Sequence, residues 1–221
     1  MTAPHEIAFD PAIGRTMRMA LDYAGVGFFA ATGAIAAGER RQDIVGFLFF
    51  AALTGIGGGT LRELLIGAPV FWVREPAYLL VCGGAAVVIW GLRGRGLDPR
   101  ALLWLDAVGL AAYAVVGASK AEAAGLGASV CVVMGVLTAA FGGVLRDIVA
   151  EQPSVLLRRE IYVTAAIGAA AVHVSLRGLG APDWAATLFA VVAGLTLRGG
   201  ALLFNWRLPQ FAPAREPPAG A

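Results

Sequence analysis

Long apolar runs alternate with short polar breaks along almost the whole chain. A helix crosses the hydrocarbon core of a membrane with about 20 mostly apolar residues. Runs near that length lie at residues 20–38, 43–66, 76–92, 102–119, 126–150, 160–176 and 183–203. The pattern predicts an all-α membrane protein in which seven transmembrane helices form a single domain over residues 1–203. Residues 204–221, which are rich in Pro and Ala, are predicted to form a disordered cytoplasmic tail.

Composition strengthens this interpretation and removes several classes of protein. The chain is 58% hydrophobic and 14% charged, with a mean hydropathy of +0.75, whereas soluble domains carry about 25% charged residues. The net charge is only +2 and no basic block occurs, so no nucleic-acid partner is predicted. Cys82 and Cys131 lie inside apolar runs and indicate neither a disulfide framework nor a metal site. No HExxH, GxSxG or Walker motif is present, so an enzyme is not expected.

The distribution of charge predicts an orientation. With seven spans the termini lie on opposite sides, and about ten Arg residues fall on the C-terminal side against about five Arg and Lys on the other. The positive-inside rule then places the N-terminus outside and the C-terminus in the cytoplasm. The first 19 residues lack the features of a signal peptide, so the first span is expected to be retained.

The chain repeats itself at an offset of 84 residues. Residues 21–90 align with 105–174 without a gap, and about 20 of the 70 pairs are identical. The most specific match is the block Gly-Gly-x-Leu-Arg-acid, at 58–63 and at 142–147. Each unit, 20–92 and 102–176, holds three spans, and an odd number forces the second to enter the membrane from the opposite side. Two inverted three-helix repeats plus a seventh helix at 183–203 are therefore predicted.

Glycines deep in the second and fifth spans mark a candidate pore. These are Gly57, Gly58, Gly59, Gly142 and Gly143. Adjacent glycines favour a kink or an unwound turn, and interrupted helices at matching positions of an inverted repeat point to a permeation or binding site. Close packing of small helix faces is the alternative. Thr54 and Thr138, one turn earlier, either line a pore or bond backbone carbonyls within the helix.

Charged residues follow these glycines inside the same spans. Arg62 and Glu63 match Arg146 and Asp147, and charges at such depth normally face the bundle interior or water. Neighbours in sequence point in different directions on a helix, so each arginine needs a partner elsewhere. Comparable depth predicts the pairs Asp22–Arg62 and Asp106–Arg146. Snorkelling of these charges to the interfaces is the alternative.

Two further titratable residues have weaker functional interpretations. Lys120 is the only lysine and has no counterpart in the other repeat. It is either a voltage sensor or, by preference, an anchor at the membrane interface. His173 has no second histidine or acidic cluster nearby in the sequence, so no metal site is predicted there.

The paired blocks 57–63 and 141–147 resemble those of the trimeric intracellular cation (TRIC) channels, and more closely their bacterial branch, which is grouped with inner-membrane proteins labelled glycine transporters. The resemblance covers residues 20–203. It implies a homotrimer in the cell inner membrane, contacting lipids, with one hourglass-shaped pore per protomer that is selective for monovalent cations, chiefly potassium. Gly57, Gly58, Gly59, Gly142 and Gly143 take the positions of the family's kink residues, and Arg62 and Arg146 those of its motif arginines. Only Lys120 remains of the lysine-rich fourth helix of animal members, which puts voltage sensitivity in doubt.

Two functions stay open on the residues. One is a passive cation channel, gated by small helix shifts, with no cofactor other than permeant K⁺ or Na⁺. The other is a secondary transporter of a small solute such as glycine, working by alternating access around the glycines. The channel is preferred on the strength of the resemblance.

Overall fold

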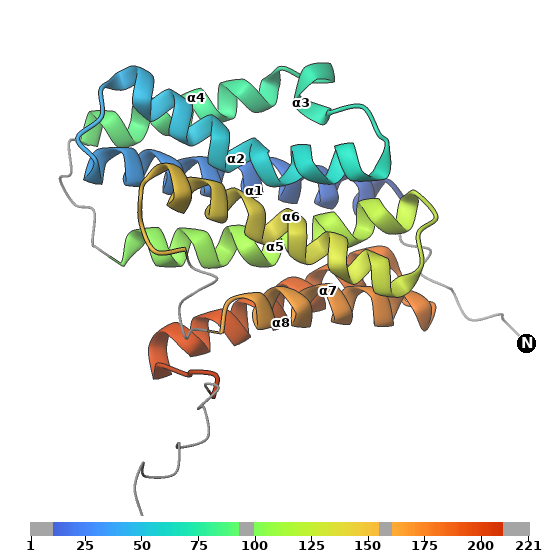
Figure 1. The fold of residues 1–221 in the computed structure, drawn as a ribbon. Coiled ribbons are helices and arrows are strands. Elements are labelled where there is room, and N and C mark those ends of the chain that lie inside the picture. Colours follow the sequence, from blue (N-terminus) through green and yellow to red (C-terminus); the bar gives the residue numbers. More distant parts are fainter. Residues whose placement is uncertain (1–10, 93–99, 155–160, 210–221) are drawn as a thin grey trace, which may run out of the picture.

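The computed structural model describes residues 11–92, 100–154 and 161–209, and this part of the chain is entirely helical apart from turns and short links (Figure 1). Its eight helices are α1 (Pro11–Glu39), α2 (Ile44–Ile66), α3 (Phe71–Arg74), α4 (Ala77–Leu92), α5 (Ala101–Ala123), α6 (Ala128–Val149), α7 (Val163–Gly178) and α8 (Asp183–Phe204). Each predicted span overlaps one of the seven longer helices. The four-residue α3 was not predicted.

Within the described residues, five helices are long and apolar enough to cross a membrane: α1 from Thr16, α2, α5, α6 and α8. The prediction of an all-helical membrane protein is confirmed. Helices α4 and α7 have 16 residues each, which is about 24 Å at 1.5 Å per residue. The count of seven spans therefore stays a prediction. Helix α1 begins at Pro11, earlier than the predicted position 20, and its extra turns carry Arg18, which pairs with Asp183 at the start of α8.

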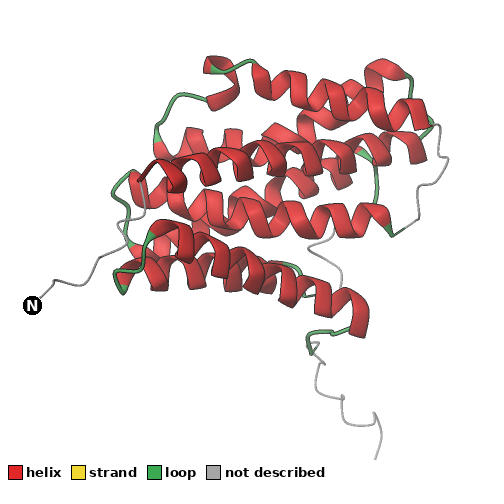
Figure 2. Cartoon of the chain, turned by 180° about the vertical axis from the view of Figure 1, so that it is seen from behind, coloured by secondary structure: helices red, strands yellow, loops and turns green. Residues whose placement is uncertain are grey.

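The helices form two groups of three with α8 at one side. Helices α1, α2 and α4 pack on one another, as do α5, α6 and α7, and the groups meet where α1 contacts α5 and α2 contacts α6. Helix α8 packs against α7 and α5. The bundle is seen from opposite sides in Figures 1 and 2. Helix α1 begins at one end of it and α8 finishes at the other (Figure 1).

Helix α2 is capped at both ends. The Asp43 carboxylate accepts a hydrogen bond from the Gly46 amide at 2.8 Å, which satisfies a free donor at the start of α2. At the other end Gly67 has φ +69°, a left-handed conformation that glycine adopts without steric cost. Helix α8 ends at Phe204. Most of the predicted cytoplasmic tail, residues 204–221, lies outside the described residues, which extend to position 209.

Small residues allow the helices to approach closely. Alanines in the core, including Ala30, Ala34, Ala51, Ala165 and Ala169, are fully buried. Because lipid provides no hydrophobic drive for helix association, close van der Waals packing of small side chains takes its place. The glycine and alanine content therefore brings helix backbones together, and this closeness positions the site.

Candidate functional site

The site is centred where α2 crosses α6, and glycine makes that crossing possible. A Cβ added to Gly58 would lie 2.1 Å from the Thr138 carbonyl oxygen, and one added to Gly142 would lie 2.3 Å from the Thr54 carbonyl oxygen. Backbone atoms cannot move aside as a flexible side chain can, so a larger residue would force the helices apart. The two contacts are reciprocal, because Gly58 matches Gly142 and Thr54 matches Thr138 at the 84-residue offset.

A kink or an unwound turn was expected at these glycines; the unwound turn is wrong, and the kink stays a prediction. Helices α2 and α6 are continuous through residues 55–59 and 142–143. Close packing is the role that the structure gives to Gly58 and Gly142. Gly57 and Gly59 are crowded by side chains instead, Leu145 at 2.9 Å and Phe71 at 2.6 Å from an added Cβ.

Both threonines bond backbone carbonyls within their own helices. The Thr54 hydroxyl donates to the Phe50 carbonyl at 2.8 Å, and the Thr138 hydroxyl donates to the Met134 carbonyl at 2.6 Å. Each side chain is almost completely buried. Of the two roles considered from the sequence, backbone bonding is the one that the structure contains.

Arg146 is at the centre of a buried group that also contains Asp106, Asp147 and Thr32, here named the Arg146 cluster. The guanidinium lies 2.9 Å from the Asp106 carboxylate and 2.9 Å from that of Asp147, and it donates to the Thr32 hydroxyl at 3.0 Å. The predicted pair Asp106–Arg146 is confirmed. All four residues are nearly inaccessible, so snorkelling to an interface is wrong for this group.

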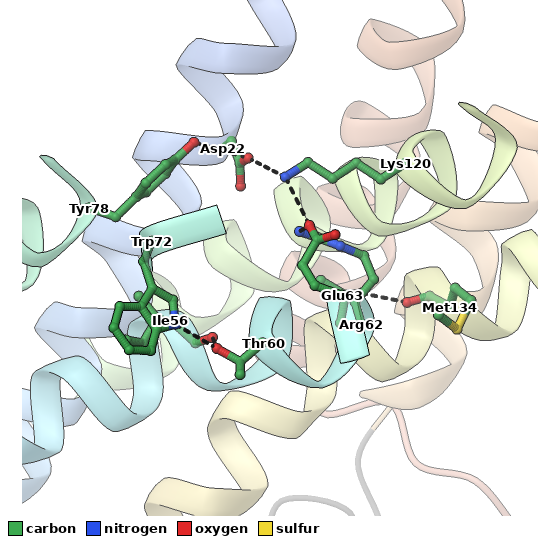
Figure 3. A network of polar contacts seen from close by, with 10 residues as sticks. Asp22, Ile56, Thr60, Arg62, Glu63, Trp72, Tyr78, Lys120 and Met134 are labelled. Carbon is green, nitrogen blue, oxygen red and sulfur yellow. Dashed lines mark hydrogen bonds and ion pairs between the residues drawn. The ribbon is translucent and has the colours of Figure 1, made fainter. Parts of the chain in front are cut away.

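Arg62 is at the centre of a second group with Asp22, Glu63 and Lys120, here named the Arg62 cluster. The predicted pair Asp22–Arg62 is wrong. Arg62 donates to its own neighbour Glu63 at 2.6 Å, and the Asp22 carboxylate is paired with Lys120 at 2.9 Å. The Lys120 ammonium also reaches Glu63 at 3.5 Å, so it bridges α1 and α2 from the end of α5 (Figure 3).

The physical reason for the error is the length of the arginine side chain. Neighbouring Cα–Cβ bonds diverge on a helix, but a guanidinium on three methylenes can turn back toward an adjacent carboxylate when both lie in the bundle interior. Arg62–Glu63 and Arg146–Asp147 both do this. The premise that each arginine needs a partner elsewhere in the chain is therefore wrong.

Aromatic residues complete the Arg62 cluster, and the sequence analysis did not assign them to it. The Tyr78 hydroxyl donates to Asp22 at 3.2 Å, and the ring of Tyr78 stacks on that of Tyr23. The Phe71 ring centroid lies 5.2 Å from the Lys120 ammonium, within the range of a cation–π contact. Tyr78 could have been found, since it matches Tyr162 in the repeat.

Lys120 does not behave as a simple interfacial anchor. Its side chain is one-third exposed and is held by two carboxylates and a ring. The exposed part lines a cavity of about 550 Å³ between the start of α1, the ends of α5 and α7 and the start of α8. Asp22, Arg18, Glu122, Arg177 and Asp183 also line this cavity, here named the Lys120 cavity.

A second cavity, of about 650 Å³, lies at the opposite end of α1. Its lining includes Arg40 and Gln42 of the α1–α2 link, Phe49 of α2, and Val149 and Glu151 at the end of α6. The Arg40 guanidinium donates to the Glu151 carbonyl at 2.8 Å. Hollows thus lie at both ends of the bundle, and the α2–α6 crossing lies along the helices between them.

No group of three or more potential metal ligands occurs among the described residues. His173 is fully buried and its Nε2 lies 3.6 Å from a Glu122 oxygen, which is one acidic neighbour and not a ligand set.

Comparison with known proteins identifies the family. The family model described as "Glycine transporter" matches residues 19–93 and 103–177, more than half of the chain. The chain belongs to this family.

Relatives of the glycine transporter family extend the match to nearly full length. The inner membrane protein YadS of Escherichia coli is 36% identical over 196 residues, which cover 87% of this chain and 95% of YadS. The structure of a TRIC trimeric intracellular cation channel orthologue from Rhodobacter sphaeroides superposes with a TM-score of 0.84 at 44% identity, covering 86% of this chain and 100% of that one. A further structure, reported for conductance through TRIC cation channels, gives a TM-score of 0.79 at 31% identity, with 90% and 98% covered. The resemblance to TRIC channels is confirmed, and these relatives are channels or membrane proteins, not enzymes.

Proposed function

We propose that the chain is a passive channel for monovalent cations, chiefly potassium, with one path inside each protomer. The observation that carries the proposal is the structural match to TRIC cation channels over the length of the transmembrane bundle. The path would run between the two cavities and past the α2–α6 crossing. In the present state the crossing is tight, because glycine backbone lies against carbonyl oxygen. Conduction would require α2 and α6 to separate by a small shift.

Charge along the proposed path favours a cation. In the Arg146 cluster two carboxylates face one guanidinium, and in the Arg62 cluster two carboxylates face one guanidinium and Lys120. These acids neutralise the arginines that would otherwise repel a cation. Charges buried inside a membrane are retained where they serve a path or a switch.

The assembly is proposed to be a homotrimer of protomers that each contain an inverted repeat. The two ranges matched by the family model, 19–93 and 103–177, are offset by the same 84 residues as the internal repeat. Reciprocal contacts such as Gly58–Thr138 and Gly142–Thr54 are what a two-fold relation produces. The trimer rests on the trimeric relative from Rhodobacter sphaeroides. The proposed orientation has the N-terminus outside and the C-terminus in the cytoplasm of a bacterial inner membrane.

A secondary transporter of glycine is the second candidate, and the description of the family model favours it. Recording from purified protein in planar bilayers separates the two. A channel gives unitary currents that are ohmic in symmetric KCl and that reverse near the potassium equilibrium potential in a gradient. Saturable glycine uptake into proteoliposomes without unitary currents would overturn the channel proposal. Empty liposomes carried through the same reconstitution are the control.

A further inference from the structure

The two charge clusters occupy matching positions but are built differently. Arg146 uses all three guanidinium nitrogens on Asp106, Asp147 and Thr32. Arg62 donates only to Glu63, and its Nε and Nη1 are buried without a hydrogen-bond partner among the described residues. Arg146 therefore pairs with the aspartate of its cluster, Asp106. Arg62 does not pair with Asp22, which is bound by another cation.

The cation that pairs with Asp22 is the ammonium of Lys120, at the end of a flexible side chain. Lys120 reaches Asp22 from α5 and has no equivalent in the first repeat, where position 36 is alanine. Its ammonium is a compact monovalent charge on a four-carbon stem. On the side of the other cluster, Arg198 is buried and lies over the Tyr162 ring at 5.2 Å. Of these two cations, Lys120 is the one that can move into an adjacent cavity.

The surroundings of the Lys120 ammonium have the composition of a site for a monovalent cation. Asp22 and Glu63 together with Arg62 carry one net negative charge, which one positive charge balances. The side chain of Asp22 is only 7% exposed, and its second oxygen accepts no hydrogen bond within the described part of the chain. A divalent ion would leave an uncompensated positive charge in this buried group, so the charge balance favours a monovalent ion. The Lys120 cavity can supply water for the remaining coordination.

We propose that Asp22 and Glu63 form a binding site for a monovalent cation of the size of K⁺, and that the Lys120 ammonium occupies it as a tethered competitor (Figure 3). The inference rests on the proposed function, because it names where an entering ion binds first. A cation that reaches Asp22 through the Lys120 cavity displaces the ammonium into that cavity, and the link from α5 to α1 and α2 is then released.

Chemical labelling of the wild-type protein tests the displacement without any substitution. Lys120 is the only lysine, so acylation with a water-soluble succinimidyl acetate, read by peptide mass spectrometry, reports on one side chain. The amino terminus of the purified chain reacts as an internal reference. We expect the ratio of Lys120 to amino-terminal labelling to rise at least twofold between 0 and 300 mM KCl. Choline chloride at equal ionic strength, whose quaternary nitrogen does not react with the ester, should leave it unchanged. A ratio that is the same in both salts overturns the proposal.

Substitution tests the site itself. In Lys120→Met the competitor is removed, and 100 mM K⁺ is expected to raise the unfolding temperature by about 3 to 5 °C relative to N-methyl-D-glucamine, if the dissociation constant is about 10 mM. The wild type should show a smaller difference. Asp22→Asn combined with Lys120→Met should lose the effect. Arg207→Met, which removes one exposed positive charge elsewhere, is the matched control and should behave as the wild type.

The outcomes separate this inference from the proposed function. Ion-selective stabilisation of Lys120→Met without unitary currents would keep the cation site and overturn the channel. Unitary potassium currents together with labelling and stability that do not depend on the ion would keep the channel and overturn the tethered competitor. If Lys120→Met does not fold, the labelling experiment on the wild type decides alone.

Discussion

Phe29 of α1 and Tyr113 of α5 pack edge to face, with ring centroids 5.5 Å apart, although they occupy the same position in two segments offset by 84 residues. Equivalent residues of two related units can touch each other only close to the axis that relates the units. The Phe29–Tyr113 contact therefore marks where the axis of the proposed inverted repeat passes between α1 and α5. Two matched glycines accommodate the rings. Gly25 lies against Tyr113 and Gly109 lies against Phe29.

The first prediction concerns this pair of glycines. A Cβ at Gly25 would lie 2.2 Å from the Tyr113 ring, whereas one at Gly109 would lie 3.2 Å from the Phe29 ring. Gly25→Ala should lower the free energy of unfolding by about 1–3 kcal/mol or more, and Gly109→Ala should lower it by less. Unfolding in detergent can be followed with a thiol-reactive dye, because Cys82 and Cys131 are both free and buried. Equal losses for the two variants would contradict the geometry.

The second prediction concerns the α2–α6 crossing. Gly58→Ala and Gly142→Ala each place a methyl group against a carbonyl oxygen, so both should lower the unfolding temperature and change unitary conductance. Gly84→Ala in α4 is the matched control, since nothing lies within 4 Å of its added Cβ. It should be neutral or raise the stability by up to about 1 kcal/mol through helix propensity. If Gly58→Ala and Gly142→Ala are tolerated as well as Gly84→Ala, the close-packing role given to Gly58 and Gly142 is refuted.

The third prediction compares the two arginines. Arg146→Met leaves the buried carboxylates of Asp106 and Asp147 without their shared guanidinium, and removing one partner of a buried ion pair costs about 3–5 kcal/mol. Arg62→Met should cost less, because Lys120 still contacts both Asp22 and Glu63. The thiol-dye measurement gives both values. A larger loss for Arg62→Met than for Arg146→Met would show that Lys120 does not compensate.

The fourth prediction concerns orientation. Fusion of a fluorescent protein to the C-terminus should give fluorescent cells, because that terminus is expected in the cytoplasm. Fusion of alkaline phosphatase at the same point should be inactive, since this enzyme needs an oxidising compartment for its disulfides. Active phosphatase with dark fluorescent fusions would reverse the assignment.

The sequence predicted the Arg146 cluster better than the Arg62 cluster, and the reason is local. Comparable depth in packed helices suggested both pairs, Asp106–Arg146 in α5 and α6 and Asp22–Arg62 in α1 and α2. Only the first forms, because Lys120 from the other repeat takes Asp22. Lys120 has no counterpart in the first repeat, and its contact with Asp22 depends on how α5 meets α1 in three dimensions. No pattern within one repeat contains that information.

The glycines show a second limit of sequence reasoning. Their recurrence in both repeats identified the correct place on α2 and α6, but adjacent glycines are compatible with an unwound turn and with a tight crossing. The partner surface decides between them, and here Thr138 and Thr54 present carbonyl oxygens at contact distance. Phe71 and Trp72 of α3 were not expected to form a helix, because a single turn leaves almost no periodic signal.

The short helix α7 has a consequence for the surrounding lipid. Its 16 residues extend about 6 Å less than a hydrocarbon core that is about 30 Å thick. If α7 crosses the membrane as predicted, the bilayer beside it must thin, at a cost that grows with acyl-chain length. Lipids with shorter chains should therefore favour whichever state of the protein exposes α7 more fully to lipid.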